Sequence, residues 1–315
     1  MKFLYTFFVF VLITSCTKEV DLVVDQPYVP SNLDVSAGAW KTFILASSAD
    51  VVVAAPKLVT DVAYLKEVDS LKTVVIPSLT STQKTAIQYW GAGAVLRWNE
   101  IMRTLVAKHN RPPYQNADGT YPTPSSANPF ASTPFPFSNP PYAARAYAYV
   151  SAAQYDALVA TWHYKRVYNR VAPYVADNTL NVLIPKNGMP SYPSEDGVLA
   201  GVTVELLKLL FPTEIAYING KAEEEKLYRI ISGANLRSDV DAGIILGRKI
   251  AAKYITRAAG DGMGAAVGNQ TIWTQLQTQT GATGETPWLS LDLPVRPPML
   301  PLFGSVRSFL MSSSD

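Results

Sequence analysis

The stretch Pro190-Ser191-Tyr192-Pro193-Ser194-Glu195-Asp196-Gly197 leads directly into an apolar run that extends from Val198 to Leu210. Its apolar residues recur at helical spacing, at Val198, Val202, Leu206 and Leu209. Ser194 is a typical N-cap residue, and the prolines before it favour an extended approach. The stretch therefore predicts a rigid segment followed by a helix whose free N–H groups face whatever lies before them.

A helix N-terminus of this kind often binds an anion. Here, however, Glu195 and Asp196 place two carboxylates in the first turn, where they stabilise the helix dipole and repel an incoming phosphate. Two interpretations follow. The stretch is either a former anion site or an ordinary helix start, because Ser, Glu and Asp are all favoured at these positions.

The composition excludes one class of function. The chain has 315 residues, of which 48% are hydrophobic, and its formal net charge is only +2. The hydrophobic content is ample for a packed core. Because there is no basic excess and no cluster of Lys and Arg, we expect no nucleic-acid partner.

The N-terminus has the pattern of an export signal. Lys2 is followed by an apolar run from Phe3 to Ile13, which is too short for a permanent membrane span, and then by the only cysteine, Cys16. The sequence Ile13-Thr14-Ser15-Cys16 resembles a bacterial lipobox, in which the cysteine is lipidated. The alternative is an ordinary signal peptide with an incidental cysteine. We expect a signal peptide over 1–15 and a protein anchored to the membrane of the bacterial cell envelope through Cys16.

The rest of the chain predicts a mainly α protein. A linker over 16–36 and an N-terminal segment over 37–79 precede a helical domain over 80–258, and a Gly-, Thr- and Pro-rich extension covers 259–315. The extension has no terminal element, which leaves open that the natural chain continues past Asp315. We find no strand pattern, and long helices with short links indicate a helical bundle.

Within the domain, helix signals are clear at several places. Thr80-Ser81-Thr82-Gln83 is a capping box that predicts a long helix to about His109. A Pro-, Asn- and Ser-rich loop over 111–141 separates it from a helix over 142–168. Later helices are predicted from Thr213 to Ser232, with a possible break at Asn219-Gly220, and after an N-cap at Ser238. The last contains a seam of small residues, Gly243, Gly247 and Ala251.

Three polar clusters lie at the ends of these helices: Lys165 with Arg170 and Pro173, then Pro193 to Asp196, then Arg229 with Asn235 and Asp239. In this order they resemble the three motifs of the type-2 phosphatidic acid phosphatase and vanadium-dependent haloperoxidase superfamily. Those motifs are Lys, six residues, Arg-Pro; Pro-Ser-Gly-His; and Ser-Arg, five residues, His, three residues, Asp. The resemblance runs from about Tyr142 to Arg257 and implies that family's helical bundle.

The resemblance also implies a site, with Lys165, Ser194, Arg229 and Asp239 at matching positions. In the family, basic groups and the helix N-terminus hold phosphate or vanadate, and two His residues act as nucleophile or vanadium ligand and as acid. In this chain Asn235 stands at the nucleophile position, Asp196 at the acid position and Ala172 at the position of the first-motif Arg. An amide nitrogen cannot replace an imidazole in either role.

The charges give a second argument. Lys165 and Arg229 face Glu195, Asp196 and Asp239, and Arg170 would bring the balance only to neutrality. An anion clamp of Lys165, Arg170 and Arg229 is therefore weak. Each residue also has a structural interpretation. Lys165 can pair with Glu195 or Asp196, Asn235 can hydrogen-bond Asp239, and Glu223-Glu224-Glu225 is a solvated helix face.

Two functions compete at this stage. The first is an envelope lipoprotein whose former active site is now a binding pocket or an ion-pair cluster, with an unidentified small-molecule or protein partner. We then expect no cofactor, and vanadate least of all. The second is an active phosphoester hydrolase, rather than a haloperoxidase, that uses Asp196 as acid or a divalent cation held by Glu195, Asp196 and Asp239, since oxygen ligands suit Ca²⁺, Mg²⁺ or Mn²⁺.

Overall fold

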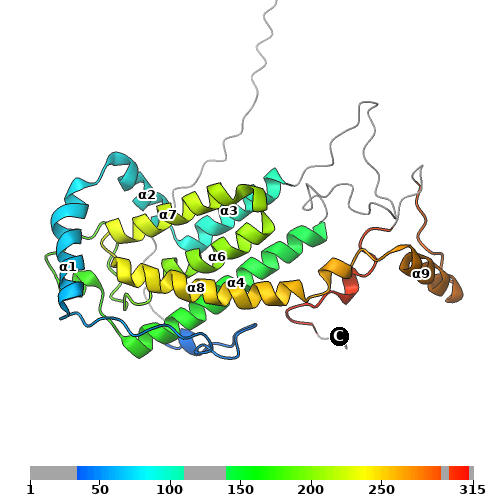
Figure 1. Ribbon diagram of the computed structural model, residues 1–315, viewed down its shortest axis with the longest axis horizontal. Helices are drawn as coiled ribbons and strands as arrows, with labels where there is room; N and C mark the ends of the chain where they lie inside the picture. The colour runs from blue at the N-terminus through cyan, green and yellow to red at the C-terminus, as the bar shows by residue number, and fades with distance from the viewer. Residues whose placement is uncertain (1–33, 110–139, 292–297, 312–315) are drawn as a thin grey trace, which may run out of the picture.

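A computed structural model describes residues 34–109, 140–291 and 298–311. Three predicted segments lie wholly or mostly outside these residues: the signal peptide with Cys16, the 16–36 linker and the 111–141 loop. The described part of the chain is helical and contains no strand (Figure 1). The predicted mainly α class is confirmed.

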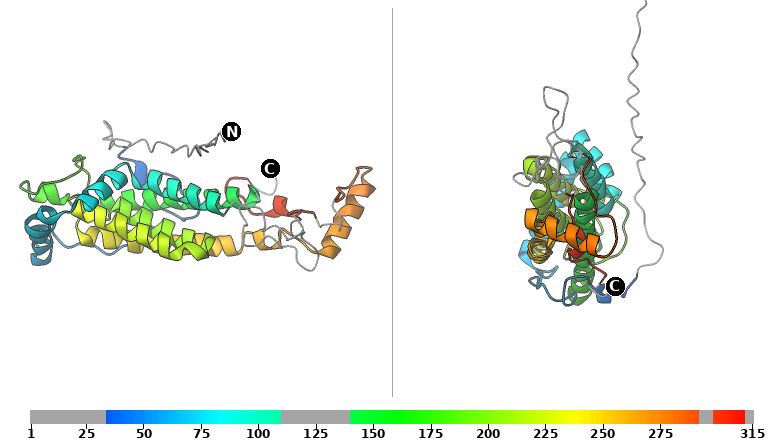
Figure 2. Two further views of the ribbon diagram at one scale, coloured as in Figure 1. Left: turned by 90° about the horizontal axis from the view of Figure 1, so that it is seen from above. Right: turned by 90° about the vertical axis from the view of Figure 1, so that its right-hand side faces the viewer.

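Long helices run side by side along an elongated body (Figure 2). They are α3 (Ala94–Lys108), α4 (Pro140–Tyr168), α6 (Glu195–Leu210), α7 (Ile215–Ile231) and α8 (Arg237–Ala259). Helix α6 lies in the middle, because it contacts each of the other four. Its residues Gly197 to Val204 are all buried, as expected for a helix that is apolar all round.

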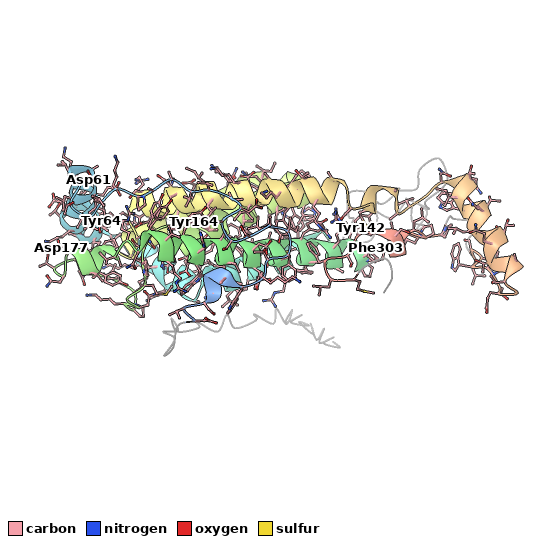
Figure 3. All side chains as sticks on the ribbon, turned by 90° about the horizontal axis from the view of Figure 1, so that it is seen from below. Asp61, Tyr64, Tyr142, Tyr164, Asp177 and Phe303 are labelled. Carbon is pink, nitrogen blue, oxygen red and sulfur yellow. The ribbon has the colours of Figure 1, made fainter. Side chains whose placement is uncertain are left out.

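Shorter elements complete the fold. They are η1 (Ala37–Ala39), α1 (Val62–Ser70), η2 (Leu71–Val75), η3 (Ile76–Ser78), α2 (Ser81–Gly91), α5 (Pro173–Ala176), η5 (Pro212–Glu214), η6 (Met263–Ala265), α9 (Gln270–Ala282) and η7 (Phe303–Ser305). Helix α1 lies at one end of the body with Tyr64, and Tyr142 and Phe303 lie towards the other end (Figure 3).

Helices α6 and α8 touch through glycines. A Cβ atom added to Gly247 would lie 2.2 Å from the carbonyl oxygen of Val198, and one added to Gly201 would lie 2.4 Å from that of Ile244. For Gly197 and Gly243 the added Cβ atoms would lie 2.6 and 2.5 Å from the carbonyl oxygens of Val240 and Ser194. The predicted small-residue seam is confirmed for Gly243 and Gly247. It lets the two backbones approach more closely than any side chain would permit.

Three local predictions are wrong. The helix from Thr80 to His109 is two helices, since the chain turns at Gly93, whose φ of 117° suits glycine. Helix α7 continues without a break through Asn219-Gly220. Helix α8 begins at Arg237 after Leu236, and Ser238 instead donates hydrogen bonds to Glu67 of α1.

Two further features were not predicted. Helix α9 forms in the Thr- and Gln-rich extension, where Asn269 caps its N-terminus and Trp273 donates a hydrogen bond to the carbonyl of Val267. In the N-terminal segment, the backbone N–H groups of residues 43, 44 and 45 donate to the carboxylate of Asp156, at 2.8, 2.9 and 3.1 Å. Asp156 therefore holds this segment against α4.

The glycine contact gives the first prediction. Gly247→Ala should lower the free energy of unfolding by about 2 kcal/mol, because the added methyl group overlaps the Val198 carbonyl and forces the helices apart. Urea denaturation measures the change. Gly220→Ala is the matched control, since it lies inside α7 with open space around it and should stabilise by roughly 0.5–1 kcal/mol. Equal stability of the two variants would contradict the close contact.

Candidate functional site

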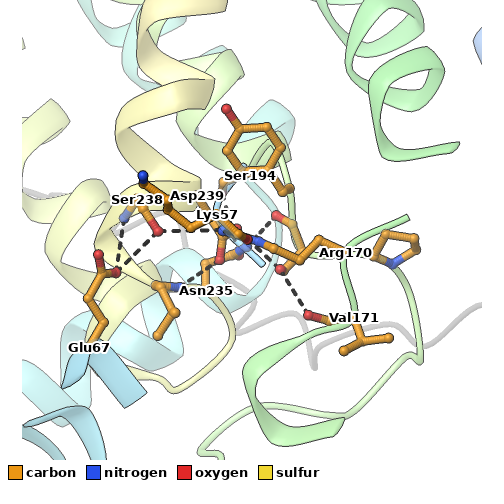
Figure 4. Close-up of polar contacts among 12 residues, drawn as sticks. Lys57, Glu67, Arg170, Val171, Ser194, Asn235, Ser238 and Asp239 are labelled. Carbon is orange, nitrogen blue, oxygen red and sulfur yellow. Dashed lines mark hydrogen bonds and ion pairs between the residues drawn. The ribbon is translucent and has the colours of Figure 1, made fainter. Parts of the chain in front are cut away.

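The first polar cluster lies where α4 ends. Lys165 is in the last turn of α4, and its side chain is buried. After the helix, Asn169 adopts a left-handed conformation with φ of 44°, which Asn tolerates better than most residues. The chain turns there, and the Arg170 guanidinium contacts the carboxylate of Asp239 on α8 (Figure 4).

The second cluster lies at the start of α6. Ser194 is its N-cap, as predicted, and its Oγ accepts a hydrogen bond from the N–H of Gly197 at 3.3 Å. The N–H of Ser194 donates to the backbone carbonyl of Asp239 at 3.0 Å. The start of α6 is therefore fixed to the first turn of α8.

The third cluster spans the turn between α7 and α8. Arg229 Nε donates to Asn235 Oδ1 at 2.6 Å, and Asn235 Nδ2 donates to the carbonyl of Ser191 at 2.7 Å. Asp239 accepts from the N–H of Leu236 at 2.8 Å and from Ser191 Oγ at 3.2 Å. The sequence suggested a hydrogen bond between Asn235 and Asp239. Instead both side chains bond to Ser191, Asn235 to its carbonyl and Asp239 to its hydroxyl.

The three clusters converge as three ion pairs. Lys165 lies 4.0 Å from Glu195, Arg229 lies 3.1 Å from Asp196, and Arg170 pairs with Asp239. The paired groups have no formal net charge. Arg170 supplies the third cation, which the charge count of the sequence needed to reach neutrality. Its guanidinium also lies over the ring of Tyr192, 4.7 Å from the centroid.

Burial affects the charged groups differently. Burial lowers the pKa of the Lys165 amine, and Glu195 opposes this shift. For Arg229, burial alone would lower the pKa, but Asp196 and its other neighbours outweigh it and raise the value above the ordinary one. The carboxylates of α6 therefore favour the charged form of both groups, and they outweigh burial at Arg229.

A small cavity remains between the clusters. Its volume is about 20 Å³, enough for about one water molecule. It is lined by Lys165, Ala172, Glu195, Arg229 and Asn235, and by Met189 and Pro190 from the segment before α6. Lys165 Nζ donates a hydrogen bond to the carbonyl of Pro190 at 2.5 Å, so a backbone oxygen of the chain already occupies one of its donor positions.

The carboxylates of the predicted cation site have separate partners. Glu195, Asp196 and Asp239 each face a different cation. In the described part of the chain, no group of three or more His, Cys, Asp or Glu residues is placed to hold a metal ion.

Comparisons with known proteins agree with this geometry at the level of the fold. No family model matches the chain, and no curated protein matches it. Among solved structures, it is similar to a bacterial vanadium-dependent iodoperoxidase, with a TM-score of 0.54 and 18% identity over 73% of this chain and 59% of that one. The chain has the haloperoxidase fold.

A second similar structure is an apo bacterial vanadium-dependent chloroperoxidase, with a TM-score of 0.51 and 14% identity over 74% of this chain and 61% of that one. The chain thus spans about three fifths of the length of each. The haloperoxidase fold brings together every residue that the motif comparison selected, because the motifs lie at helix ends that meet at one end of the bundle.

Sequence reasoning missed Glu225, which lies one helical turn before Arg229. It is buried, and its Oε2 accepts a hydrogen bond from Trp98 Nε1 at 2.6 Å. Its Oε1 has no hydrogen-bond partner among the residues that the structure describes. Burial raises the pKa of this carboxyl well above its usual range, Asp196 adds to the shift, and the Trp98 indole opposes it. The run of glutamates is therefore not a solvated face. The sequence signal for its position near the site was its four-residue spacing from Arg229, which places both residues on one face of the helix.

The contribution of the Asp196–Arg229 pair to the free energy of unfolding can be measured by substitution. Asp196→Ala leaves a guanidinium that is only 15% exposed without its carboxylate, so we expect a loss of about 2 kcal/mol, between the values for exposed and fully buried pairs. Urea denaturation measures it against Glu223→Ala, since Glu223 is exposed on α7. Glu224 is unsuitable as a control because it accepts the Trp90 indole N–H. Equal losses in both variants would show that the pair contributes nothing.

Glu225 gives a pH-dependent prediction. Its folded-state pKa is raised, so its contribution to stability is fullest below about pH 4.5 and is lost as the pH rises towards the folded value. Glu225→Gln removes this titration. The stability of the variant relative to wild type should therefore increase by about 1.4 kcal/mol per pH unit across that window. Denaturation at pH 4.5 and pH 8, with Glu223→Gln as control, tests it; the same difference at both pH values would contradict the raised pKa.

Proposed function

We propose that this chain is a lipid-anchored protein of the bacterial cell envelope that keeps the haloperoxidase fold without the His-dependent chemistry of that family. In this proposal the former active site is an ion-pair cluster that holds the helices in register. The proposal rests on the sequence of the export signal and on the contacts of the three clusters.

One observation carries the proposal most directly. Asn235 stands where the resemblance places the nucleophile, and its Nδ2 donates to the carbonyl of Ser191 while its Oδ1 accepts from Arg229. The lone pair of an amide nitrogen is delocalised, so this nitrogen neither attacks phosphorus nor ligates vanadium as an imidazole nitrogen would. Both polar atoms of the side chain are used in holding neighbouring backbone and side chains.

The residues present do not fit vanadate. Each of the three cations faces a carboxylate, and the cavity between them holds about one water molecule. An oxyanion entering the site would have to break ion pairs and approach Glu195 and Asp196. The same argument applies to a phosphate group.

No observation favours the alternative of a phosphoester hydrolase. Asp196, the candidate acid, is paired with Arg229, and none of the described residues that line the cavity is His or Cys. A divalent cation would need the three carboxylates to converge, whereas they face separate partners.

The anchor is supported by the sequence alone. A short apolar run followed by Ile13-Thr14-Ser15-Cys16 is typical of a lipidated export signal. Within residues 34–109, 140–291 and 298–311, no helix has the length and apolar character of a membrane span. The proposed membrane attachment through Cys16 rests on the sequence of this signal.

The chemistry is tested by assay of the purified protein. We expect no hydrolysis of p-nitrophenyl phosphate and no vanadate-dependent oxidation of bromide or iodide above the background without protein, because the nucleophile position holds an amide. Turnover that disappears in Lys165→Ala but survives in Lys226→Ala would contradict the proposal. Lys226 is a fair control, since it pairs with Asp241 away from the cavity.

A further inference from the structure

Large apolar side chains are exposed on the side of the bundle where the described chain begins. Trp40 and Phe43 are 46% and 44% exposed, although both are aromatic. They pack on the same ring of α4, since Trp40 stacks on Tyr155 with 6.4 Å between centroids and Phe43 meets Tyr155 edge-on at 5.2 Å. Their positions are therefore fixed, with part of each ring facing outward.

More apolar surface adjoins these rings. Phe43 also contacts Phe309, with 6.3 Å between ring centroids, and Leu310 and Met311 follow Phe309 directly in the chain. Leu310 is 82% exposed. On the other side, Val35 is 67% exposed and lies beside α4, where its carbonyl accepts a hydrogen bond from Arg166. We call Val35, Trp40, Phe43, Leu310 and Met311 the aromatic patch.

The support beneath the patch is rigid. The carboxylate of Asp156 on α4 accepts hydrogen bonds from the N–H groups of residues 43 to 45. Gly38 of η1 packs so closely on α4 that a Cβ atom there would lie 2.6 Å from the backbone nitrogen of His163. The patch is thus a preformed surface. Exposed apolar surfaces of this kind usually mark an interaction site.

The position of the patch indicates the occupant. Val35 follows directly on the segment that begins at Cys16, and the chain from Cys16 to Asp34 reaches at most about 65 Å when extended. A lipid on Cys16 would therefore hold the patch near the bilayer, so its contact with the membrane would be effectively intramolecular. Tryptophan is also the residue most suited to the boundary between headgroups and acyl chains.

The charges beside the patch fit the same occupant. Lys41 lies between Trp40 and Phe43 and is exposed, and Arg166 is exposed next to Val35. The nearby carboxylate of Asp34 accepts hydrogen bonds from Ser36. Exposed cations beside apolar rings suit anionic headgroups.

We infer that the aromatic patch lies on the surface of the bilayer and fixes the orientation of the anchored bundle, an inference that rests on the proposed lipid anchor. The rings of Trp40 and Phe43 enter the headgroup boundary, and Lys41 and Arg166 meet the headgroups. A second copy of the chain or another protein on this patch would be a different outcome of the test.

The test uses the full-length protein, purified from a host that lipidates it, in vesicles of phosphatidylethanolamine and phosphatidylglycerol with brominated acyl chains. Bromine quenches the fluorescence of tryptophans that it can approach. The two strongly exposed tryptophans are Trp40 and Trp288, and Trp288 is 51% exposed. We expect quenching of the wild type, loss of most of it in Trp40→Phe, and no loss in Trp288→Phe. Phe43→Glu should also reduce the quenching, whereas Leu65→Glu, which changes an exposed side chain of α1, should not.

The outcomes separate the two proposals. Equal quenching in wild type and Trp40→Phe, in protein that floats with the vesicles, overturns the membrane contact and leaves the anchor intact. Protection of Trp40 from quenching together with a dimer or a bound protein also overturns it. Wild-type protein that does not float, and behaves like Cys16→Ala, overturns both the anchor and the contact.

Discussion

The close contact of α6 with α8 is the constraint on which the rest of the structure depends. Glycines on each helix lie against carbonyl oxygens of the other, so the distance between the two axes is set by backbone atoms and not by side chains. This contact places the N–H of Ser194 on the carbonyl of Asp239. The first turns of both helices thereby lie together, and the polar residues before and within them meet at one end of the bundle.

The ion pairs follow from that geometry. Lys165 comes from α4, Arg229 from α7 and Arg170 from the turn after α4, and each reaches a carboxylate on the first turn of α6 or α8. Removing one partner of such a pair leaves a poorly solvated charge, which is why buried pairs are costly to break even where their net contribution is small. Under the proposed function the pairs specify which helix ends belong together, while the apolar core supplies most of the stabilisation.

Features that depend on local chemistry could be predicted from the sequence. Conformational preference or spacing along the chain indicates each of four features: the capping box at Thr80, the N-cap at Ser194, the seam at Gly243 and Gly247, and Arg170 as a further cation of the site. The burial of Glu225 and the bridging role of Ser191 could not be predicted in this way. Each depends on a partner distant in sequence, as Glu225 depends on Trp98, so its environment is decided by packing.

The substitutions relative to the resembled motifs make sense together as charge compensation. Three cations near one another repel and are poorly solvated unless negative charge lies among them. Where the family motif has Gly-His, this chain has Glu195-Asp196, which supply that charge from within the protein and face Lys165 and Arg229. An imidazole at position 235 alone would consequently not recreate an anion site, because the carboxylates of α6 would still occupy the cations. Under the proposed function, Asn235 in place of the nucleophile and the carboxylates that neutralise the cations belong to one change. Together they replace a site for an external anion with an internal contact between helices.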